Sequence, residues 1–241
     1  MSVILGPKQR EKGDGAVRLA VATGTKARVE GMTAPVAGWG ADLLLLPRQP
    51  GEEPSDGPTA RALGDLAAAA GLAVAWTFVE RADGVPYLAL QVAAADGTAL
   101  AHYRAAHPDP GLAPGSWLTV VPFDPHRPGL LLARDPLDPE TARALALAGA
   151  ASLLALEAPP LDGDLLDALV RVRAYENGLP CLAWTTGGRV VAATGEGRPV
   201  PLERLDDGLL GVLLPPGPGL ARERRAELFQ ILAREPEPRR G

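Results

Sequence analysis

The stretch GLLLARDPLDPETAR, residues Gly129–Arg143, decides how the rest of the chain is interpreted. Its apolar start predicts a short buried strand that ends near Ala133. Asp138 suits a helix N-cap, Pro139 suits the first helical position, and Glu140 complements the helix dipole. A strand that leads to a helix N-terminus is a common place for a nucleophile, because backbone N–H groups there stabilise developing negative charge. Ala133 has no reactive group, so the scaffold for chemistry lacks its nucleophile.

Length and composition indicate one globular domain with a full core, or two small domains. The chain has 241 residues, of which 46% are hydrophobic and 22% are charged, as is ordinary for globular proteins. A net charge of −5 and a pI near 5.3 argue against a nucleic-acid or anionic-membrane surface. The single cysteine fits a reducing cytoplasm, and no apolar run approaches the roughly 20 residues of a membrane span. We therefore expect a cytoplasmic protein without membrane or nucleic-acid partners.

The composition also has a bias toward proline and away from amides. The chain contains 25 prolines, and Asn177 is its only asparagine. A thermophile would limit labile amides and stiffen its loops in this way. A GC-rich genome would enrich alanine, arginine, glycine and proline without any heat, and we favour that simpler explanation.

Apolar runs and helical segments alternate along the chain, which predicts a layered α/β domain. Strands are predicted at Val17–Ala22, Asp42–Leu46, Leu72–Glu80, Pro86–Ala94, Leu100–Arg104, Trp117–Pro122, Ser152–Leu156, Leu179–Trp184, Arg189–Ala193 and Leu209–Leu214. Helices are predicted at Pro58–Ala70, Thr141–Ala148, Leu161–Glu176 and Ala221–Arg234, with a poor helix over Lys26–Gly40. In Leu161–Glu176, residues Leu165, Leu169 and Val172 predict the apolar side. We expect a flexible lead over residues 1–15, one domain over 16–234 and a charged tail over 235–241.

Short motifs occur in a defined order between Val17 and Leu214. They are Gly40-Ala41-Asp42 before LLLLP, Glu80-Arg81-Ala82-Asp83-Gly84, Tyr103-Arg104, Pro114-Gly115, Pro139-Glu140 and Arg173-Ala174-Tyr175-Glu176-Asn177. Their order and spacing resemble those of the nitrilase, or carbon–nitrogen hydrolase, superfamily. The resemblance implies an α/β fold with a single domain, a four-layer α-β-β-α sandwich. It also implies a homodimer that pairs through its helical layers.

Members of that superfamily hydrolyse nitriles or amides with a glutamate, a lysine and a cysteine. The thiolate attacks the carbon, the glutamate acts as general base, and the lysine stabilises the tetrahedral intermediate. Matched by motif, these positions hold Arg48, Ala105 and Ala133. The resemblance therefore implies a degenerate member without the catalytic residues, and we expect no cofactor. The vestigial pocket that it implies contains Arg48, His107, Asp135, Glu140 and Glu176.

Other residues could supply chemistry in place of the missing ones. Cys181 is the only thiol and a candidate alternative nucleophile, but its apolar surroundings favour a core position. His102, His107 and His126 match no metal-ligand spacing, so we expect no metal site. Arg48 either faces the old pocket, where it would favour an anion such as a carboxylate, or points to solvent.

Three functions follow from these residues. The sequence favours a catalytically inactive homologue that acts as a binding, regulatory or assembly subunit, with a protein partner or a small anionic ligand. One alternative is an active amidase-like or nitrilase-like hydrolase of non-peptide C–N bonds, with an apparatus relocated to Cys181. The other is a small-molecule anion sensor built around Arg48. Whether the chain is an enzyme thus stays open, and inactivity is the favoured interpretation.

Overall fold

The computed structural model describes residues 15–23 and 29–220. The expected helix Ala221–Arg234, the expected tail and residues 1–14 of the expected lead lie outside the described residues. Within the described ranges, none of the helices has both the length and the apolar character needed to cross a membrane.

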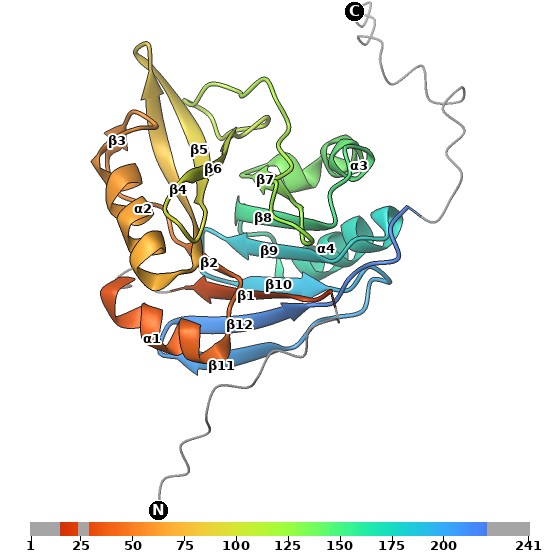
Figure 1. The fold of residues 1–241 in the computed structure, drawn as a ribbon. Helices are drawn as coiled ribbons and strands as arrows, with labels where there is room; N and C mark the ends of the chain where they lie inside the picture. The colour runs from red at the N-terminus through yellow and green to blue at the C-terminus, as the bar shows by residue number, and fades with distance from the viewer. Residues whose placement is uncertain (1–14, 24–28, 221–241) are drawn as a thin grey trace, which may run out of the picture.

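The larger of two β-sheets has eight strands (Figure 1). They are β1 (Val17–Ala22), β2 (Leu43–Leu46), β3 (Glu52–Glu53), β4 (Ala73–Ala82), β5 (Val85–Ala93), β6 (Ala99–Arg104), β11 (Leu202–Asp206) and β12 (Leu209–Leu214). The order is β11-β12-β1-β2-β4-β5-β6, with β3 paired to β4 off this path. The pairs β1–β2, β2–β4 and β3–β4 are parallel, and the other neighbours are antiparallel. The edge strand β6 leads directly to Ala105.

The smaller sheet has four strands in the order β10-β9-β8-β7. They are β7 (Pro128–Leu132), β8 (Ser152–Ala158), β9 (Cys181–Thr185) and β10 (Val190–Ala193). Strands β7, β8 and β9 are parallel, and β10 returns antiparallel to β9. The C-terminal ends of the parallel strands therefore meet at one edge, and Ala133 follows β7 at that edge.

Helices cover the outer face of each sheet (Figure 1). They are α1 (Val29–Trp39), α2 (Pro58–Ala70), α3 (Pro139–Leu147) and α4 (Gly163–Asn177), with a 3-10 turn η1 at Asp135–Leu137. Helix α1 contacts β11 and α2 contacts β4 and β5, whereas α3 contacts β7 and β8 and α4 contacts β9 and β10. Three apolar clusters separate the four layers. The predicted α/β single-domain fold with an α-β-β-α arrangement is confirmed.

Strand β2 shows how an apolar run produces this layering. Leu43 and Leu45 belong to the cluster between the two sheets, whereas Leu44 and Leu46 belong to the cluster beneath α1 and α2. Successive side chains of a strand point to opposite faces, so a strand covered on both sides must be apolar throughout. Burial of each leucine contributes about 1.5–3 kcal/mol relative to exposure.

Helix α2 has the bounds that its local sequence predicts. Pro58 occupies the start, where the missing N–H would have no helical partner. Gly71 closes the helix with a left-handed φ of 60°, and its N–H donates to the Ala68 carbonyl oxygen at 3.3 Å. These two local signals suffice to place both ends of the helix.

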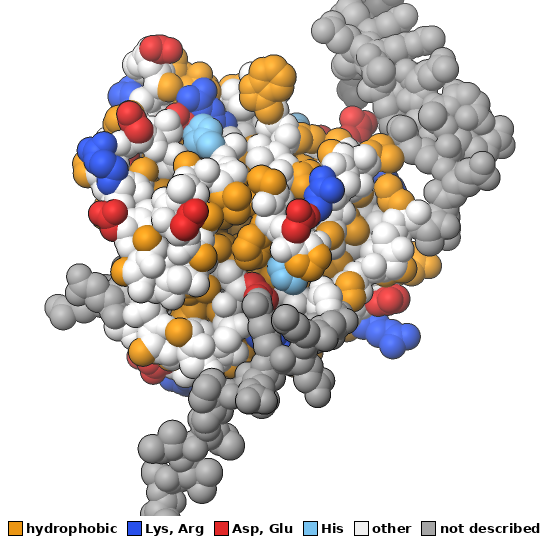
Figure 2. All heavy atoms as spheres, viewed as in Figure 1, with side chains coloured by type: hydrophobic (Ala, Val, Ile, Leu, Met, Phe, Trp, Pro, Cys, Tyr) orange, Lys and Arg blue, Asp and Glu red, His pale blue; other side chains and the backbone are white. Residues whose placement is uncertain are grey.

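On the face shown in Figure 2, apolar side chains form a band between the part of the molecule that carries β4–β6 and the part that carries β7–β9. The cluster between the sheets is flanked by partly buried Leu100, Ala101, Leu112, Phe123 and Leu210. The apolar layer between the sheets thus continues toward the surface on this side, with charged side chains around it (Figure 2).

One predicted strand is absent from the structure, and one observed strand was not predicted. The segment Trp117–Pro122 forms no strand and makes only the isolated bridge between Val120 and Gly129. Trp117 is 82% exposed, and Pro122 has no N–H to donate to a ladder. Conversely, β11 was not predicted, because this edge strand is mostly exposed and polar and lacks an apolar alternation.

The prediction for the apolar side of α4 is correct for helical spacing but wrong for the buried face. Leu165 and Val172 are exposed, and the buried side chains lie one position further along the chain. They are Leu166, Val170, Arg173, Ala174 and Asn177. Both sets have helical spacing, so periodicity alone does not distinguish them.

Helix α1 forms in the segment that was expected to be a poor helix. It runs over Val29–Trp39 with Pro35 inside it. Val36 is fully buried in the cluster beneath the helix. Packing of this face against the sheet therefore outweighs the unfavourable propensity of glycine and proline.

Candidate functional site

Ala133 occupies the sharp turn at the end of β7. Its φ of 47° is left-handed, a conformation that costs a non-glycine residue roughly 1–3 kcal/mol. Its N–H donates to the Leu156 carbonyl oxygen at 3.2 Å, which ties the turn to β8. The side chain is 1% exposed. The strained turn suited to a nucleophile is present, and it carries a methyl group closed off from solvent.

Ala105 follows β6 and lies in the same central cluster as Ala133. Its side chain is 0% exposed. Its N–H donates to the Leu88 carbonyl oxygen at 2.9 Å, and its own carbonyl accepts from Gly115 N–H at 2.7 Å. A Cβ on Gly115 would come within 2.3 Å of the Arg104 carbonyl oxygen, so only glycine permits this close approach. The backbone around Ala105 is therefore fixed by hydrogen bonds on both sides.

Arg48, at the motif position of the general base, forms an ion pair. Its Nη2 lies 2.9 Å from Oε2 of Glu157, and its side chain is 39% exposed. The other oxygen of Glu157 accepts from the Thr77 hydroxyl at 2.7 Å. Glu157 has a left-handed φ of 57° and directly follows Leu156, the residue bonded to Ala133. An ion pair therefore lies beside the turn that holds Ala133.

The partner of Arg48 was missed by reasoning from sequence. Glu157 is the lone acidic residue in the apolar strand β8, and this is the signal that could have identified it. The two interpretations of Arg48 had it facing the pocket or facing solvent. The structure shows the guanidinium partly exposed and paired with a carboxylate.

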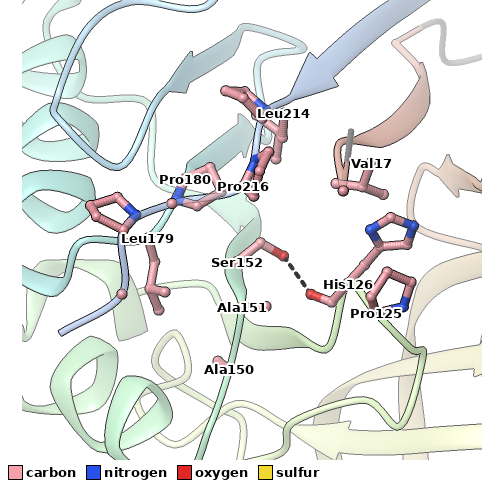
Figure 3. A pocket seen from close by; sticks show the side chains of 15 residues that line it. Val17, Pro125, His126, Ala150, Ala151, Ser152, Leu179, Pro180, Leu214 and Pro216 are labelled. Carbon is pink, nitrogen blue, oxygen red and sulfur yellow. Dashed lines mark hydrogen bonds between the residues drawn. The ribbon is translucent and has the colours of Figure 1, made fainter. Parts of the chain in front are cut away.

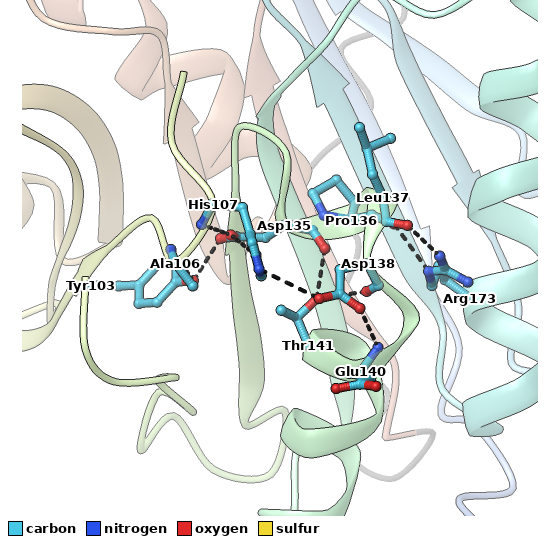
Figure 4. Close-up of polar contacts among 10 residues, drawn as sticks. All are labelled: Tyr103, Ala106, His107, Asp135, Pro136, Leu137, Asp138, Glu140, Thr141 and Arg173. Carbon is cyan, nitrogen blue, oxygen red and sulfur yellow. Dashed lines mark hydrogen bonds and ion pairs between the residues drawn. The ribbon is translucent and has the colours of Figure 1, made fainter. Parts of the chain in front are cut away.

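Asp135 is the most constrained polar residue of this region (Figure 4). Its carboxylate is fully buried and accepts from the Tyr103 hydroxyl at 2.6 Å. It also accepts from the N–H groups of His107 at 2.7 Å and Leu132 at 2.8 Å. Burial and the adjacent carboxylate raise the pKa of Tyr103, which keeps that hydroxyl protonated as a donor. Asp135 thus joins β6, the loop after it and the end of β7.

The histidine of the expected pocket lies beside Asp135. His107 is about half exposed, with Nδ1 3.3 Å from Asp135 and Nε2 3.5 Å from Asp138. Its carbonyl oxygen accepts from Arg134 N–H at 3.2 Å, which links the segment after Ala105 to the segment after Ala133. The structure therefore brings these two motif positions together.

The two glutamates of the expected pocket lie in the helical layer instead. Glu140 is exposed in the first turn of α3, where its N–H donates to the Asp138 cap at 2.8 Å (Figure 4). Glu176 lies near the end of α4 and pairs with Arg173 at 3.1 Å. The Arg173 guanidinium also donates to the carbonyl oxygens of Pro136 and Leu137. Glu176 therefore acts on the turn after β7 through Arg173, whereas Glu140 contributes its backbone N–H to the cap of α3.

Cys181 begins β9 and is 2% exposed in the cluster beneath α3 and α4. Burial raises the pKa of its thiol to about 12, although the charge of Arg173 acts in the opposite direction. The thiolate is the nucleophilic form of cysteine, so a buried thiol with a raised pKa is unreactive at neutral pH.

A cavity of about 350 Å³ lies near the first residue of β1 and the last residue of β12 (Figure 3). Apolar and proline side chains line most of it, including Val17, Pro180 and Pro216. The Ser152 hydroxyl donates to the carbonyl oxygen of His126 at 3.4 Å. Neither Arg48 nor the two alanine positions line this cavity.

In the described ranges, no group of three or more His, Cys, Asp and Glu residues is arranged to hold a metal ion.

The α-β-β-α fold and the sharp turn at Ala133 after β7 define a nitrilase-type protein. The described layers carry the motif positions of a base, a lysine and a nucleophile near the ends of β2, β6 and β7. The chain belongs to the carbon–nitrogen hydrolase family, whose family model matches residues 36–198. This match includes all three motif positions.

Individual relatives agree with this assignment. A Pseudomonas protegens protein described as "Hydrolase in pqqF 5'region" is 36% identical over 133 residues, which are 52% of this chain and 47% of that protein. The chain thus spans about half the length of this curated relative. An amidase from Nesterenkonia sp. is similar in structure, with a TM-score of 0.71, 22% identity and coverage of 91% of this chain and 97% of the amidase. A carbon–nitrogen hydrolase from Helicobacter pylori has a TM-score of 0.70, 17% identity and coverage of 92% and 99%.

Proposed function

We propose that this chain is a non-catalytic member of the carbon–nitrogen hydrolase family that acts as a binding, regulatory or assembly subunit. The observation that carries the proposal is Ala133, a buried methyl group in the strained turn where the family reaction needs a thiolate. Arg48 and Ala105 supply neither the general base nor the lysine ammonium. Loss of one member of such a unit already costs orders of magnitude in rate.

The two alternatives receive less support from the geometry. A hydrolase that uses Cys181 would require its buried thiol to ionise and reach substrate. An anion sensor built around Arg48 would require its ligand to compete with Glu157, which already occupies the guanidinium at 2.9 Å.

An amide-hydrolysis assay tests the proposal. The protein is incubated with acetamide, butyramide and acrylamide at pH 7, and released ammonia is measured against a Cys181→Ala variant. We expect both proteins to release no ammonia above the buffer rate. Release by the native chain that disappears in Cys181→Ala would refute the proposal and establish the relocated apparatus.

The thiol of Cys181 gives an independent prediction. A chromogenic disulfide reagent at neutral pH is expected to label the native protein at least roughly 100-fold more slowly than the urea-unfolded protein, because the thiol is buried and its pKa is raised to about 12. Equal labelling rates for the native and unfolded protein would show that Cys181 is accessible and nucleophilic.

The assembly role that we propose uses α4 in a homodimer. Leu165, Val172 and Tyr175 are exposed apolar side chains at helical spacing on the side of α4 away from the sheet. A second copy fits this stripe, because two-fold symmetry would place antiparallel α4 helices against each other. In that arrangement Asp164 of one copy would approach Arg171 of the other, and their charges are complementary.

Sedimentation equilibrium tests the dimer. We expect a mass of twice the 25.0 kDa of one chain. Val172→Asp is expected to raise the dimer dissociation constant by at least roughly 100-fold, because symmetry places two carboxylates in the interface. Leu213→Asp changes an exposed apolar residue on β12 and serves as the control that leaves the dimer intact. A monomeric native chain, or a dimer insensitive to Val172→Asp, would overturn this model.

A further inference from the structure

A second polar cluster lies on the outer face of the larger sheet, near its β6 edge. Tyr103 and Ala105 belong to the core between the sheets. Because side chains alternate along a strand, His102 and Arg104 point to the opposite face. Glu80 on β4 contacts both of them there. The thickness of the sheet therefore separates this cluster from the Ala133 turn.

Glu80 holds its two basic neighbours in fixed positions. Nε and Nη2 of Arg104 donate to its two oxygens at 2.7 and 2.8 Å, and His102 Nε2 lies 2.9 Å from Oε2. Burial opposes ionisation of Glu80, but the hydrogen bonds and charges of Arg104 and His102 outweigh it and lower the pKa of the carboxyl group. The Arg104 guanidinium also lies 4.1 Å from the centre of the Tyr87 ring. The guanidinium is therefore preorganised before any ligand arrives.

A cavity of about 360 Å³ opens over this cluster. Its walls combine Tyr87, His102 and Arg104 with Trp117 from the loop that follows β6. Trp117 is 82% exposed, an unusual position for so large an apolar ring. The volume lies within the range of about 300–1,000 Å³ that is typical of small-molecule sites.

The Arg104 guanidinium has hydrogen-bond donors beyond those it uses toward Glu80. Arg104 uses only its Nε–H and one Nη2–H toward Glu80, and no other acceptor for its guanidinium occurs among the described residues. The carboxylate of Glu80 is already occupied by three contacts. The free edge of a guanidinium matches a carboxylate in shape and charge. A ligand that fits must therefore bring acceptor atoms, and its flat face would contact an aromatic wall.

We propose that this cavity binds a small planar carboxylate, with its ring against Trp117 and its carboxylate on the free edge of Arg104. Charge-assisted hydrogen bonds orient the anion, and stacking on the indole discriminates flat rings from aliphatic acids. The site lies on the opposite face from Ala133, so its occupancy does not depend on whether the family reaction occurs.

The test uses benzoate as the probe, with the full chain labelled with ¹⁵N at its four tryptophans. We expect benzoate to shift the Trp117 indole signal saturably, while the signals of buried Trp76 and Trp184 stay in place. Acetate lacks the ring and benzamide lacks the charge. Each is expected to bind at least about threefold to tenfold more weakly, the range that corresponds to loss of one aromatic or charged contact.

Two variants and one control make the test specific. Calorimetry with Trp117→Ala is expected to show that benzoate binds about threefold to tenfold more weakly. Arg104→Lys keeps the positive charge but loses the planar pair of N–H donors, and it is expected to weaken benzoate binding about tenfold. Leu118→Ala removes a neighbouring exposed side chain and should bind like the native chain. The proposal is overturned if benzoate produces no saturable shift, if benzamide binds as tightly, or if Trp117→Ala binds benzoate with native affinity.

Discussion

Replacement of Asp135 by alanine is expected to lower the free energy of unfolding by about 4–6 kcal/mol, which is much of the stability of an ordinary domain. The carboxylate is fully buried and accepts three hydrogen bonds, from the Tyr103 hydroxyl and from the N–H groups of His107 and Leu132. Alanine leaves all three donors without an acceptor, and each buried unsatisfied group costs about 1–3 kcal/mol. Chemical denaturation followed by circular dichroism measures the effect.

Two further variants make the Asp135 result interpretable if the alanine variant does not fold. Asp135→Asn keeps one acceptor oxygen and is expected to retain a folded, less stable protein. Asp138→Ala removes the half-buried N-cap that accepts from Glu140 N–H, and should cost only about 1 kcal/mol. If Asp135→Ala costs no more than Asp138→Ala, Asp135 does not join the strands as we describe.

Local chemistry explains which parts of the fold could be predicted. Asp138 caps a backbone N–H only two residues away, and Gly71 ends α2 through its own φ of 60°. Such signals act within one turn of chain, so the sequence contains them completely. The α/β layering was predictable for a related reason, because runs such as Leu43–Leu46 are stable only when covered on both faces.

The buried face of α4 depends on tertiary contacts that a helical pattern does not contain. The stripe with Leu165 and Val172 is more apolar than the buried one, which includes Arg173 and Asn177. Arg173 enters the protein because the carbonyl oxygens of Pro136 and Leu137 accept from it, and these carbonyls belong to a turn 36 or 37 positions away. No rule of periodicity anticipates such a partner.

In the candidate site too, some features follow from the local sequence and others depend on distant contacts. That alanine stands at residue 133, the position matched by motif to the nucleophile, is visible from the sequence alone. The environment of Arg48 is not, because its partner Glu157 is 109 positions away in sequence. The sequence could pose the choice between pocket and solvent, but only the packing of the two sheets brings Glu157 to Arg48 and Thr77. Site residues that act through distant pairs therefore escape sequence reasoning even when the family motif is clear.

Introduction of lysine at Ala105 is expected to lower the free energy of unfolding by roughly 3–5 kcal/mol at pH 7. Ala105 is 0% exposed in the apolar cluster between the sheets, and its backbone is fixed on both sides by hydrogen bonds. A lysine there must bury its ammonium or force the cluster apart. Denaturation by urea at pH 7 measures the loss, with Ala105→Met as a control of similar length without charge.

The pH dependence separates the cost of charge from the cost of volume. A buried lysine has a lowered pKa, so the unfolded state binds more protons than the folded state between that value and about 10.4. Stability of Ala105→Lys should therefore rise relative to Ala105→Met as the pH increases from 7 toward 10. If the two variants lose equal stability at every pH, the introduced ammonium reaches water or a carboxylate, and the site is open enough to accept the family apparatus. If the gap closes at high pH, the surroundings of Ala105 disfavour an ammonium group, as expected for a position enclosed in the apolar cluster between the sheets.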